Sequence, residues 1–383
     1  MLRFLTAGES HGPALVAVVE GLPAGLPVVI DDIAGELARR RLGFGRGPRM
    51  RFEQDELEFL GGVRHGRTLG SPVAILIRNT EWPKWVDEMS PAPGKTESPL
   101  RRPRPGHADL VGMQKYGLDD ARDVLERASA RETAARVAAG ALAKLLLGQL
   151  GVQVLSHVVQ LGAAHASPER RPKPADLETV DASPVRCFDP DAEAAMIAEV
   201  EAAAAAGDSL GGLVEVLGYG VPPGLGSHVH WDRRIDGLIA QALMSIQAMK
   251  GVELGDGFEV AGLRGSEAHD EILWDADANR YNRGSTRAGG TEGGMTTGDL
   301  LVARVAMKPL STLNKPVLKT VDLDTKEETV SFKERTDVTA VPASGIVAEA
   351  MIALVLANES LRKFGGDSMV EIVRNHDAYL ASL

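Results

Sequence analysis

Residues 1–23 read MLRFLTAGESHGPALVAVVEGLP, and this stretch predicts how the chain begins to fold. Two short apolar runs that contain β-branched residues, Leu2–Ala7 and Ala14–Glu20, flank the loop GESHGP. Runs of this kind, bounded by glycine and proline, are typical of β-strands. We therefore predict two strands joined by a polar loop.

The loop contains GESHG, Gly8–Gly12, which fits the G-x-S-x-G pattern of a hydrolase nucleophile elbow with Ser10 as nucleophile. Such an elbow needs a helix directly after the serine. Here Pro13 and the following LVAVV indicate a strand instead. The mismatch weighs against a serine hydrolase, which we keep as an alternative.

Composition and charge narrow the class of protein. The chain has 383 residues, 44% hydrophobic and 25% charged, which is enough for one large domain or two modest ones. Its formal net charge of −11 weighs against a dedicated nucleic-acid binder. The single cysteine, Cys187, excludes an intrachain disulfide and fits a reducing, cytoplasmic setting. We expect no signal peptide and no membrane span, because the most apolar long segment, Ala134–Leu155, also carries charged side chains.

Three helices are predicted, from Asp31 to Leu42, from Ser129 to Gly151 and from Pro342 to Gly365. Asp31 is a plausible N-cap of the first helix. The stretch SARE, with Ser129 at the N-cap and Glu132 three residues later, reads as a capping box. Proline suits the first position of the third helix.

A weak repeat also indicates strands. Segments starting at Gly66, Gly207 and Gly294 share G-x-[ST]-x-G followed by an apolar run, which fits either internal duplication or similar loop chemistry. Residues 158–195 are rich in proline and charge, so we expect a surface excursion there. With no low-complexity linker, residues 1–383 are interpreted as one domain of α+β class.

Arginine is concentrated in two loops. Residues 39–51 contain six arginines and no acid, and residues 100–107 add three more. Guanidinium groups bind carboxylate or phosphate through paired hydrogen bonds, so an anion site is indicated. The alternative is a solvated charge run or a salt-bridged contact. Arg127, Ser129 and Arg131 cluster at the predicted start of the second helix, which also favours anion binding.

Two histidines and a glycine-rich stretch complete the candidate chemistry. His11 and His107 lie in glycine-flanked loops and fit proton transfer to an anionic ligand. AGGTEGGMTTG, residues 288–298, would let backbone approach a flat or phosphorylated ligand. It is neither a dinucleotide-binding nor a Walker pattern. With one cysteine and no paired histidines, we expect no metal site.

Together, these stretches resemble the chorismate synthase family over nearly the whole chain. Any one block would be modest evidence, but their ordered combination is specific. The matching blocks, in chain order, are GESHGPAL from Gly8, RRRLGFGRGPRM, RPGHAD, RASARETAARVAAGA from Arg127, SIQAMKGVE, AGGTEGGMTTG, KPLST, and RTDVTAVPASGIVAEAMIA from Arg335.

The resemblance implies the reaction. 5-Enolpyruvylshikimate 3-phosphate would lose phosphate and a C6 hydrogen in an anti-1,4 elimination, giving chorismate in the last step of the shikimate pathway. Reduced FMN would be required without net redox change, because in this family the flavin donates an electron transiently and then recovers it.

The resemblance also implies roles for residues. His107 would protonate the departing phosphate, His11 the reduced flavin, and Asp337 would help to manage the proton at flavin N5. The substrate contacts would be Ser10, Arg40, Arg46, Arg49, Arg131 and Arg335. The FMN contacts would be Arg127, Ala128, Ser129, Gln247, Ala248, Gly293, Lys308, Pro309, Leu310, Ser311, Thr312 and Arg335.

At the level of the whole protein, the resemblance implies helices packed between antiparallel β-sheets, a β-α-β sandwich, and a homotetramer. Nothing resembles an added reductase segment, so we favour an external flavin reductase, with NADPH as an indirect reductant. Arg40 and Arg46 are sometimes linked to NADP in this family, and we favour substrate anions as their ligands.

The alternative functions are a hydrolase with Ser10 as nucleophile and a non-catalytic anion- or RNA-binding protein, whose nucleic-acid binding would be salt-sensitive. We expect no nucleic-acid or membrane partner.

Overall fold

The two strands expected at the start of the chain are present as β1 (Arg3–Ala7) and β2 (Ala14–Glu20), and they pair antiparallel. The computed structural model describes residues 1–46, 55–277, 279–332 and 337–383. β6 (Val73–Arg78) and β3 (Leu57–Gly61) extend the pair into an antiparallel sheet of order β1-β2-β6-β3. Alternate residues of β2 and β6 are buried, so one face of this sheet packs on the core.

A second antiparallel sheet has the order β10-β15-β9-β7-β8. Its strands are β10 (Met249–Leu254), β15 (Leu301–Met307), β9 (Gly212–Tyr219), β7 (Gln153–Leu161) and β8 (Ala164–His165). Each of the three G-x-[ST]-x-G segments leads into a strand, as predicted. β9 and β15 are neighbours in this sheet, whereas β6 lies in the other sheet, so duplication and local loop chemistry both stay open.

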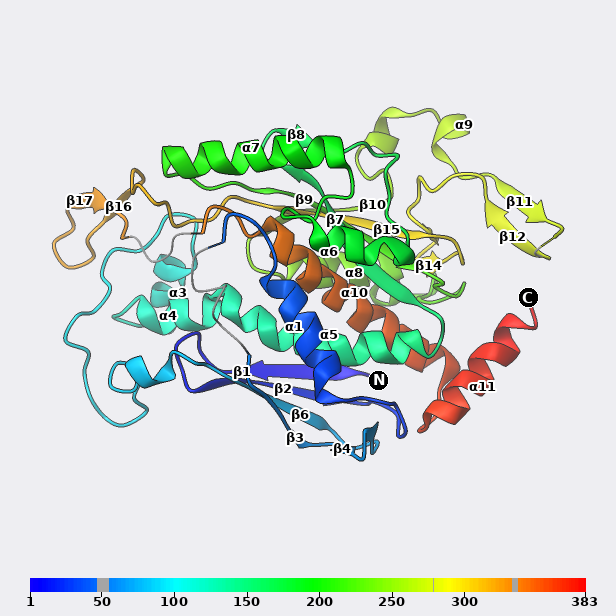
Figure 1. Ribbon diagram of the computed structural model, residues 1–383, viewed down its shortest axis with the longest axis horizontal. Helices are drawn as coiled ribbons and strands as arrows, with labels where there is room; N and C mark the ends of the chain where they lie inside the picture. The colour runs from blue at the N-terminus through cyan, green and yellow to red at the C-terminus, as the bar shows by residue number, and fades with distance from the viewer. Residues whose placement is uncertain (47–54, 278, 333–336) are drawn as a thin grey trace.

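A layer of helices lies between the two sheets (Figure 1), formed by α1 (Ile30–Arg41), α5 (Thr133–Gly148) and α10 (Val341–Phe364). α5 packs against β2 and α10, and α10 packs against β7 and β9. Gly140 allows the two helices to approach, because a Cβ there would lie 2.3 Å from Cβ of Ala350. α10 is long and apolar enough to cross a membrane, but it is almost entirely buried inside the protein. The predicted α+β class is confirmed.

Two predicted helix starts need correction. The N-cap of α1 is Val29 rather than Asp31, and Asp32 closes the turn by accepting from the Val29 amide at 2.8 Å. Ser129 does cap, but it caps a short 3₁₀ helix, Ala130–Glu132, that precedes α5. The Glu132 carboxylate does not complete the predicted capping box, because it accepts hydrogen bonds from residues distant in the sequence, including Thr6 Oγ1 at 2.7 Å. α5 ends at Gly148 rather than Gly151.

The expectation of a surface excursion over residues 158–195 holds only in part. This stretch contains the end of β7 together with α6 (Leu177–Ala182) and the start of α7 (Pro190–Ala206), and it has both exposed and buried residues. One charge of the stretch lies in the interior: Arg186 is fully buried and pairs with Asp181 and Glu349. For Arg186, charge was misleading because carboxylate partners compensate it inside the protein.

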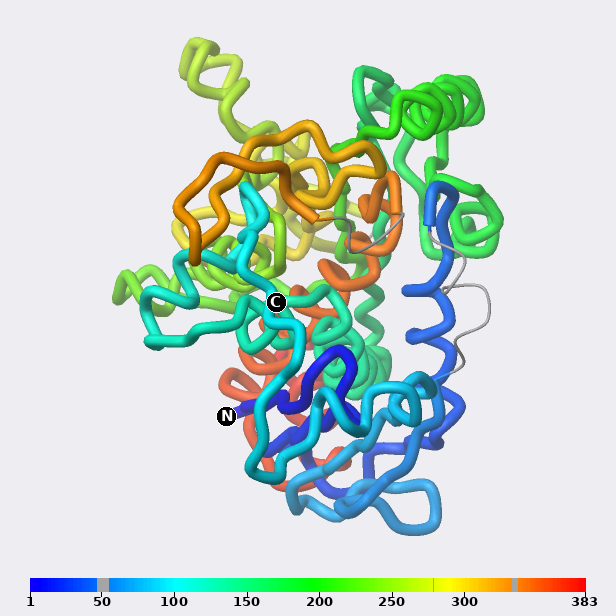
Figure 2. Tube along the Cα trace, turned by 90° about the vertical axis from the view of Figure 1, so that its left-hand side faces the viewer, coloured from blue at the N-terminus to red at the C-terminus, as the bar shows by residue number. Residues whose placement is uncertain are grey.

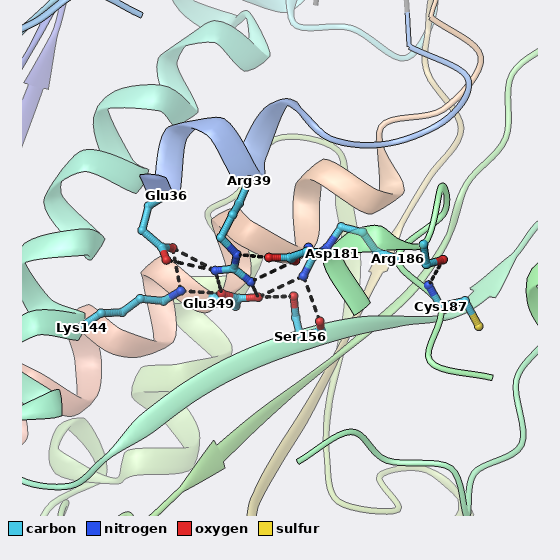
Figure 3. A network of polar contacts seen from close by, with 9 residues as sticks. Glu36, Arg39, Lys144, Ser156, Asp181, Arg186, Cys187 and Glu349 are labelled. Atoms are coloured by element: carbon cyan, nitrogen blue, oxygen red, sulfur yellow. Dashed lines mark hydrogen bonds and ion pairs between the residues drawn. The ribbon is translucent and has the colours of Figure 1, made fainter. Parts of the chain in front are cut away.

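The same buried network contains Arg39, from the arginine run that was interpreted as an anion site (Figure 3). Arg39 lies 2.8 Å from Glu349 and 2.7 Å from Asp181. Lys144 contacts Glu349 and Glu36. For Arg39, therefore, the salt-bridged alternative is the correct one. The network joins α1, α5, α6 and α10.

The remaining elements are short hairpins and helices. They are the hairpins β4 (Val63–Arg64) with β5 (Arg67–Thr68), β11 (Ile272–Asp275) with β12 (Arg280–Arg283), β13 (Thr291–Glu292) with β14 (Met295–Thr296) and β16 (Lys319–Val321) with β17 (Glu328–Val330), and the helices α3 (Asp109–Tyr116), α4 (Arg122–Ala128), α8 (Ile235–Met244), α9 (Gly265–Ala268) and α11 (Met369–Leu380). The β16–β17 segment lies beside the chain near residue 100 (Figure 2), where Leu323 N donates to Arg101 O at 3.0 Å.

Candidate functional site

Loops that are far apart in the sequence meet around a cavity of about 390 Å³. Its lining comes from the β1–β2 loop, the chain after α1, the loop before α3, the end of α4, the chain before β10, the chain after β15 and the chain before α10. The predicted site residues that line it are Ser10, His11, Arg46, His107, Ala128, Ser129, Gln247, Ala248, Lys308, Pro309, Leu310, Ser311, Thr312 and Asp337.

His107 is held by a buried carboxylate. Its Nδ1 makes a short contact with Asp109, whose side chain is fully buried at the start of α3. Arg104 donates to the same carboxylate from Nε at 2.8 Å and from Nη2 at 3.0 Å. Burial alone would raise the pKa of Asp109, but the hydrogen bonds from His107 and Arg104 outweigh it and hold the pKa well below its usual value. An ionised Asp109 therefore orients the His107 ring.

The GESHG loop is tied down by polar contacts on both sides. Asn79, at the end of β6, donates from Nδ2 to the carbonyls of Glu9 and Gly12 at 3.0 and 2.8 Å. The Ser129 hydroxyl donates to Ser10 Oγ at 3.2 Å. Ser10 is thus a polar residue of the cavity lining and lies next to the end of α4.

His11 is also paired with a buried carboxylate. Nδ1 of His11 lies 2.8 Å from Oε1 of Glu126 on α4. The His11 ring stacks on Trp85 with ring centroids 4.1 Å apart. The cavity therefore has two histidines in its lining, and each is oriented by a carboxylate.

A third wall is formed where the chain after β15 meets the chain before β10. Lys308 N donates to Ala248 O at 3.0 Å, and the Lys308 ammonium contacts Gly106 O. Ala248 has φ of +68°, a conformation that is uncommon outside glycine and often marks functional sites. Gln247 donates to Glu132 at 2.9 Å, whereas its buried Oε1 has no hydrogen-bond partner among the described residues. A ligand N–H would satisfy that oxygen.

Arg46 and Asp337 bring the chain after α1 to the chain before α10. Arg46 Nε lies 3.4 Å from Asp337 Oδ1. The backbone supports this approach, because Val338 N donates to Gly45 O at 2.8 Å. A cation and a carboxylate are thus placed together in the lining of the cavity.

Several predicted residues lie elsewhere. Arg131 donates to Asp55 Oδ1 at 2.7 Å and to Asn79 Oδ1 at 3.0 Å, and Arg40 donates to Thr133 Oγ1 at 2.9 Å. Both side chains are buried in contacts with the protein. Those contacts explain why neither Arg40 nor Arg131 is in the lining.

Arg127 and Gly293 are also outside the lining of the cavity. Arg127 donates to the carbonyl of Gly8 at 3.1 Å, so it braces the GESHG loop from behind. Gly293 lies in the turn between β13 and β14. Arg49 and Arg335 lie outside the described residues.

Arg104 belongs to the arginine-rich stretch 100–107 that was predicted to bind anions, and it lines the cavity. Asp109 and Glu126, which orient the two histidines, were not predicted. Asp109 could have been found, because it lies two residues after His107 within the block RPGHAD. Glu126 and Trp85 carry no local signal, because only the fold brings them to His11.

The chemistry of the lining suits a polyanionic ligand. Arg46, Arg104 and Lys308 provide positive charge, and the histidine pairs provide groups that can transfer protons. An apolar wall, which includes Leu125, Met307 and Leu310, suits a planar ring system.

Comparisons with known proteins agree with this picture. The family model for chorismate synthase matches residues 2–361. The chain is 62% identical to the chorismate synthase of Salinispora tropica and 61% identical to that of Thermobifida fusca, covering 100% of this chain and 99% of each relative. A crystal structure of chorismate synthase superposes with a TM-score of 0.80 at 42% identity, covering 100% of this chain and 98% of that one. They give no support to a hydrolase or a non-catalytic binder. The chain belongs to the chorismate synthase family.

Proposed function

We propose that the cavity between His11 and His107 is where this chain eliminates phosphate from 5-enolpyruvylshikimate 3-phosphate, with reduced FMN bound beside the substrate. As a chorismate synthase, the chain is a lyase of the shikimate pathway, which leads to the aromatic amino acids. The observation that carries the proposed location is the pair of carboxylate-oriented histidines in one cationic cavity.

Substrate binding follows from charge. The substrate has two carboxylates and a phosphate, and Arg46, Arg104 and Lys308 line the cavity as its cations. Ser10 would add a polar contact. Arg40 and Arg131 are buried in contacts with the protein and do not line the cavity, so we place them in a supporting role. For Arg49 and Arg335, substrate contact stays a prediction.

Proton transfer would be divided among three residues of the lining. His107, oriented by Asp109, would donate a proton to the departing phosphate. Asp337 would help to manage the proton at flavin N5, and Arg46 beside it would hold the ionised carboxylate in place. His11, when its ring carries a proton on both nitrogens, would donate from Nε2, the nitrogen opposite Glu126, to the reduced flavin.

The lining also fits a flavin. The unpartnered Oε1 of Gln247 could accept from a ring N–H, and the apolar wall could cover a planar ring. The residues that would hold FMN are Ala128, Ser129, Gln247, Ala248, Lys308, Pro309, Leu310, Ser311 and Thr312. When bound, reduced FMN would supply an electron reversibly, so that the carbon–oxygen bond to phosphate breaks without net redox change.

Further proposals rest on the family resemblance: a cytoplasmic homotetramer in which the helix layer between two sheets forms a β-α-β sandwich. Reduced FMN would come from an external flavin reductase, with NADPH acting indirectly.

Flavin placement can be tested by titration. Replacing Gln247 by leucine removes the buried acceptor, so FMN affinity in the presence of substrate should fall by about tenfold, roughly one net hydrogen bond. Gln241→Leu, which changes an exposed glutamine of α8, is the matched control. Fluorescence titration showing equal FMN affinity for Gln247→Leu and the parent chain would contradict this placement.

A further inference from the structure

We propose that Glu126 is a positioning residue that sets which nitrogen of His11 carries the proton and which nitrogen meets the ligand. The inference concerns the histidine that the proposed function assigns to flavin protonation, and it rests on that assignment for its catalytic consequence. Its structural part, the state of the His11 ring, stands on contacts within the chain alone.

Both carboxylate oxygens of Glu126 are committed to His11. Oε1 lies 2.8 Å from Nδ1 of the ring, and Oε2 accepts from the His11 backbone N–H at 2.8 Å. The His11 and Glu126 side chains are only 8% and 2% exposed, so water competes little for these bonds. One carboxylate therefore fixes the backbone and the ring of the same residue.

The surroundings keep Glu126 ionised. Burial would raise the pKa of Glu126, but hydrogen bonds from His11 outweigh it and, together with the charge of Arg122, hold the pKa below its usual value. Arg122 Nη1 lies 3.1 Å from Oε1 of Glu126, and Nε of the same arginine lies 3.4 Å from Oε1 of Glu88. An ionised carboxylate can only accept hydrogen bonds.

The ring is also held from its face. Trp85 stacks on His11 with an interplanar angle of 28°, and the Arg122 guanidinium lies 4.9 Å from the Trp85 ring centroid. Trp85 and Glu126 thus each contact the His11 ring, and Arg122 contacts both Trp85 and Glu126. This arrangement leaves the ring little freedom to flip.

The consequence is a fixed tautomer. Because the carboxylate accepts only, neutral His11 must carry its proton on Nδ1, and Nε2 becomes the nitrogen that exchanges protons with a ligand. A glutamine at position 126 would offer one acceptor and one donor to the same two N–H groups. One of those N–H groups would then face an amide donor, and the tautomer would no longer be fixed.

The test uses the ligand-free chain. Nitrogen-15 spectra of the histidine rings at alkaline pH distinguish Nδ1–H from Nε2–H tautomers, and His11→Ala identifies the His11 signals. We expect Nδ1–H in the parent chain and a mixed or Nε2–H ring in Glu126→Gln. Asp123→Asn, which neutralises an exposed carboxylate of the same helix, should leave the spectrum unchanged. Identical His11 signals in Glu126→Gln and the parent chain would overturn the proposal.

Kinetics separate positioning from a structural role. Glu126→Gln should lower kcat about 10²-fold, the lower end for a positioned acid or base, with KM nearly unchanged. If that variant does not fold, Glu126→Asp keeps the charge but is too short to reach both N–H groups, and it should show the same change of tautomer. A parent chain that shows the tautomer but no flavin-dependent turnover would refute the proposed function while leaving the positioning of His11 intact.

Discussion

Nε of Arg46 lies 3.4 Å from Oδ1 of Asp337, so the arginine-rich chain after α1 meets the carboxylate that precedes α10 inside one cavity. The contact offers two accounts of Asp337. It could accept a proton during the reaction, or it could serve only to orient Arg46. We favour the first account, and kinetics can separate the two.

Asp337→Asn retains the size of the side chain but weakens its ability to accept a proton. We expect kcat to fall by about 10²- to 10⁴-fold, the usual contribution of a positioned acid or base, with KM nearly unchanged. Steady-state kinetics at saturating reduced FMN would measure the split. A raised KM with unchanged kcat would show that Asp337 only orients its neighbour.

Arg46→Ala should have the opposite signature. Arg46 would hold the substrate anion in both the ground and transition states, so its loss should appear mainly in KM. A charge-assisted hydrogen bond contributes roughly 1.5–3 kcal/mol, which corresponds to a KM raised about 10- to 150-fold. Exposed Arg374 on α11 provides the matched control, Arg374→Ala, which should leave KM unchanged. An unaltered KM in Arg46→Ala would remove Arg46 from the substrate site.

The Asp109–His107 pair should act as a unit. His107→Ala should lower kcat by about 10²- to 10⁴-fold. Asp109→Asn should lower kcat in the same direction, because an amide cannot hold the His107 ring as the buried carboxylate does. If the two residues act together, the double variant should be little worse than His107→Ala alone. Additive losses in the double variant would mean that Asp109 acts independently of His107.

The buried network in Figure 3 should dominate local stability. Glu349 is fully buried and contacts Arg39, Lys144 and Arg186. Glu349→Gln would leave these cations under-compensated and should lower the free energy of unfolding by about 3–5 kcal/mol. Glu201→Gln, at an exposed position of α7, should change it by less than about 0.5 kcal/mol. Urea titration of both variants measures the difference, and a loss below about 1 kcal/mol for Glu349→Gln would contradict the prediction.

Acid should weaken the fold through Glu215. Burial would raise its pKa, but hydrogen bonds with His157 and Arg171 outweigh burial and lower the pKa from 4.5 to about 2. Because the pKa of Glu215 is lower in the folded than in the unfolded chain, the ionised carboxylate stabilises the fold fully at pH values above the unfolded pKa. This stabilisation is lost as the pH falls toward the folded pKa. Glu215→Gln should therefore destabilise the chain more at about pH 6 than at about pH 3. Equal destabilisation at the two pH values would contradict this account.

The parts of the site that have local signals could be predicted from the sequence. His11 and His107 could be predicted because glycine-flanked histidines in loops seldom serve packing. Arg39 and Arg46 occur in one arginine run, yet Arg39 forms ion pairs in the buried network whereas Arg46 lines the cavity. The partner that decides this, Glu349, is 310 residues from Arg39. No local pattern contains that information.

The fold shows the same division. β1, β2 and α10 follow from apolar patterning and were predicted at nearly the observed bounds. Within residues 158–195, Arg186 was misread because a distant partner, Glu349, compensates its charge rather than water. Glu126 was missed for the same reason, since 115 residues separate it from His11.

We infer that this cavity performs a flavin-dependent elimination with His107 as the acid. The most direct measurement is anaerobic incubation of the chain with 5-enolpyruvylshikimate 3-phosphate, with and without reduced FMN, followed by quantification of chorismate and phosphate. We predict equal amounts of both products with reduced FMN, neither product without it, and turnover lowered by about 10²- to 10⁴-fold in His107→Ala. Equal product formation without flavin, or normal turnover in His107→Ala, would contradict the account.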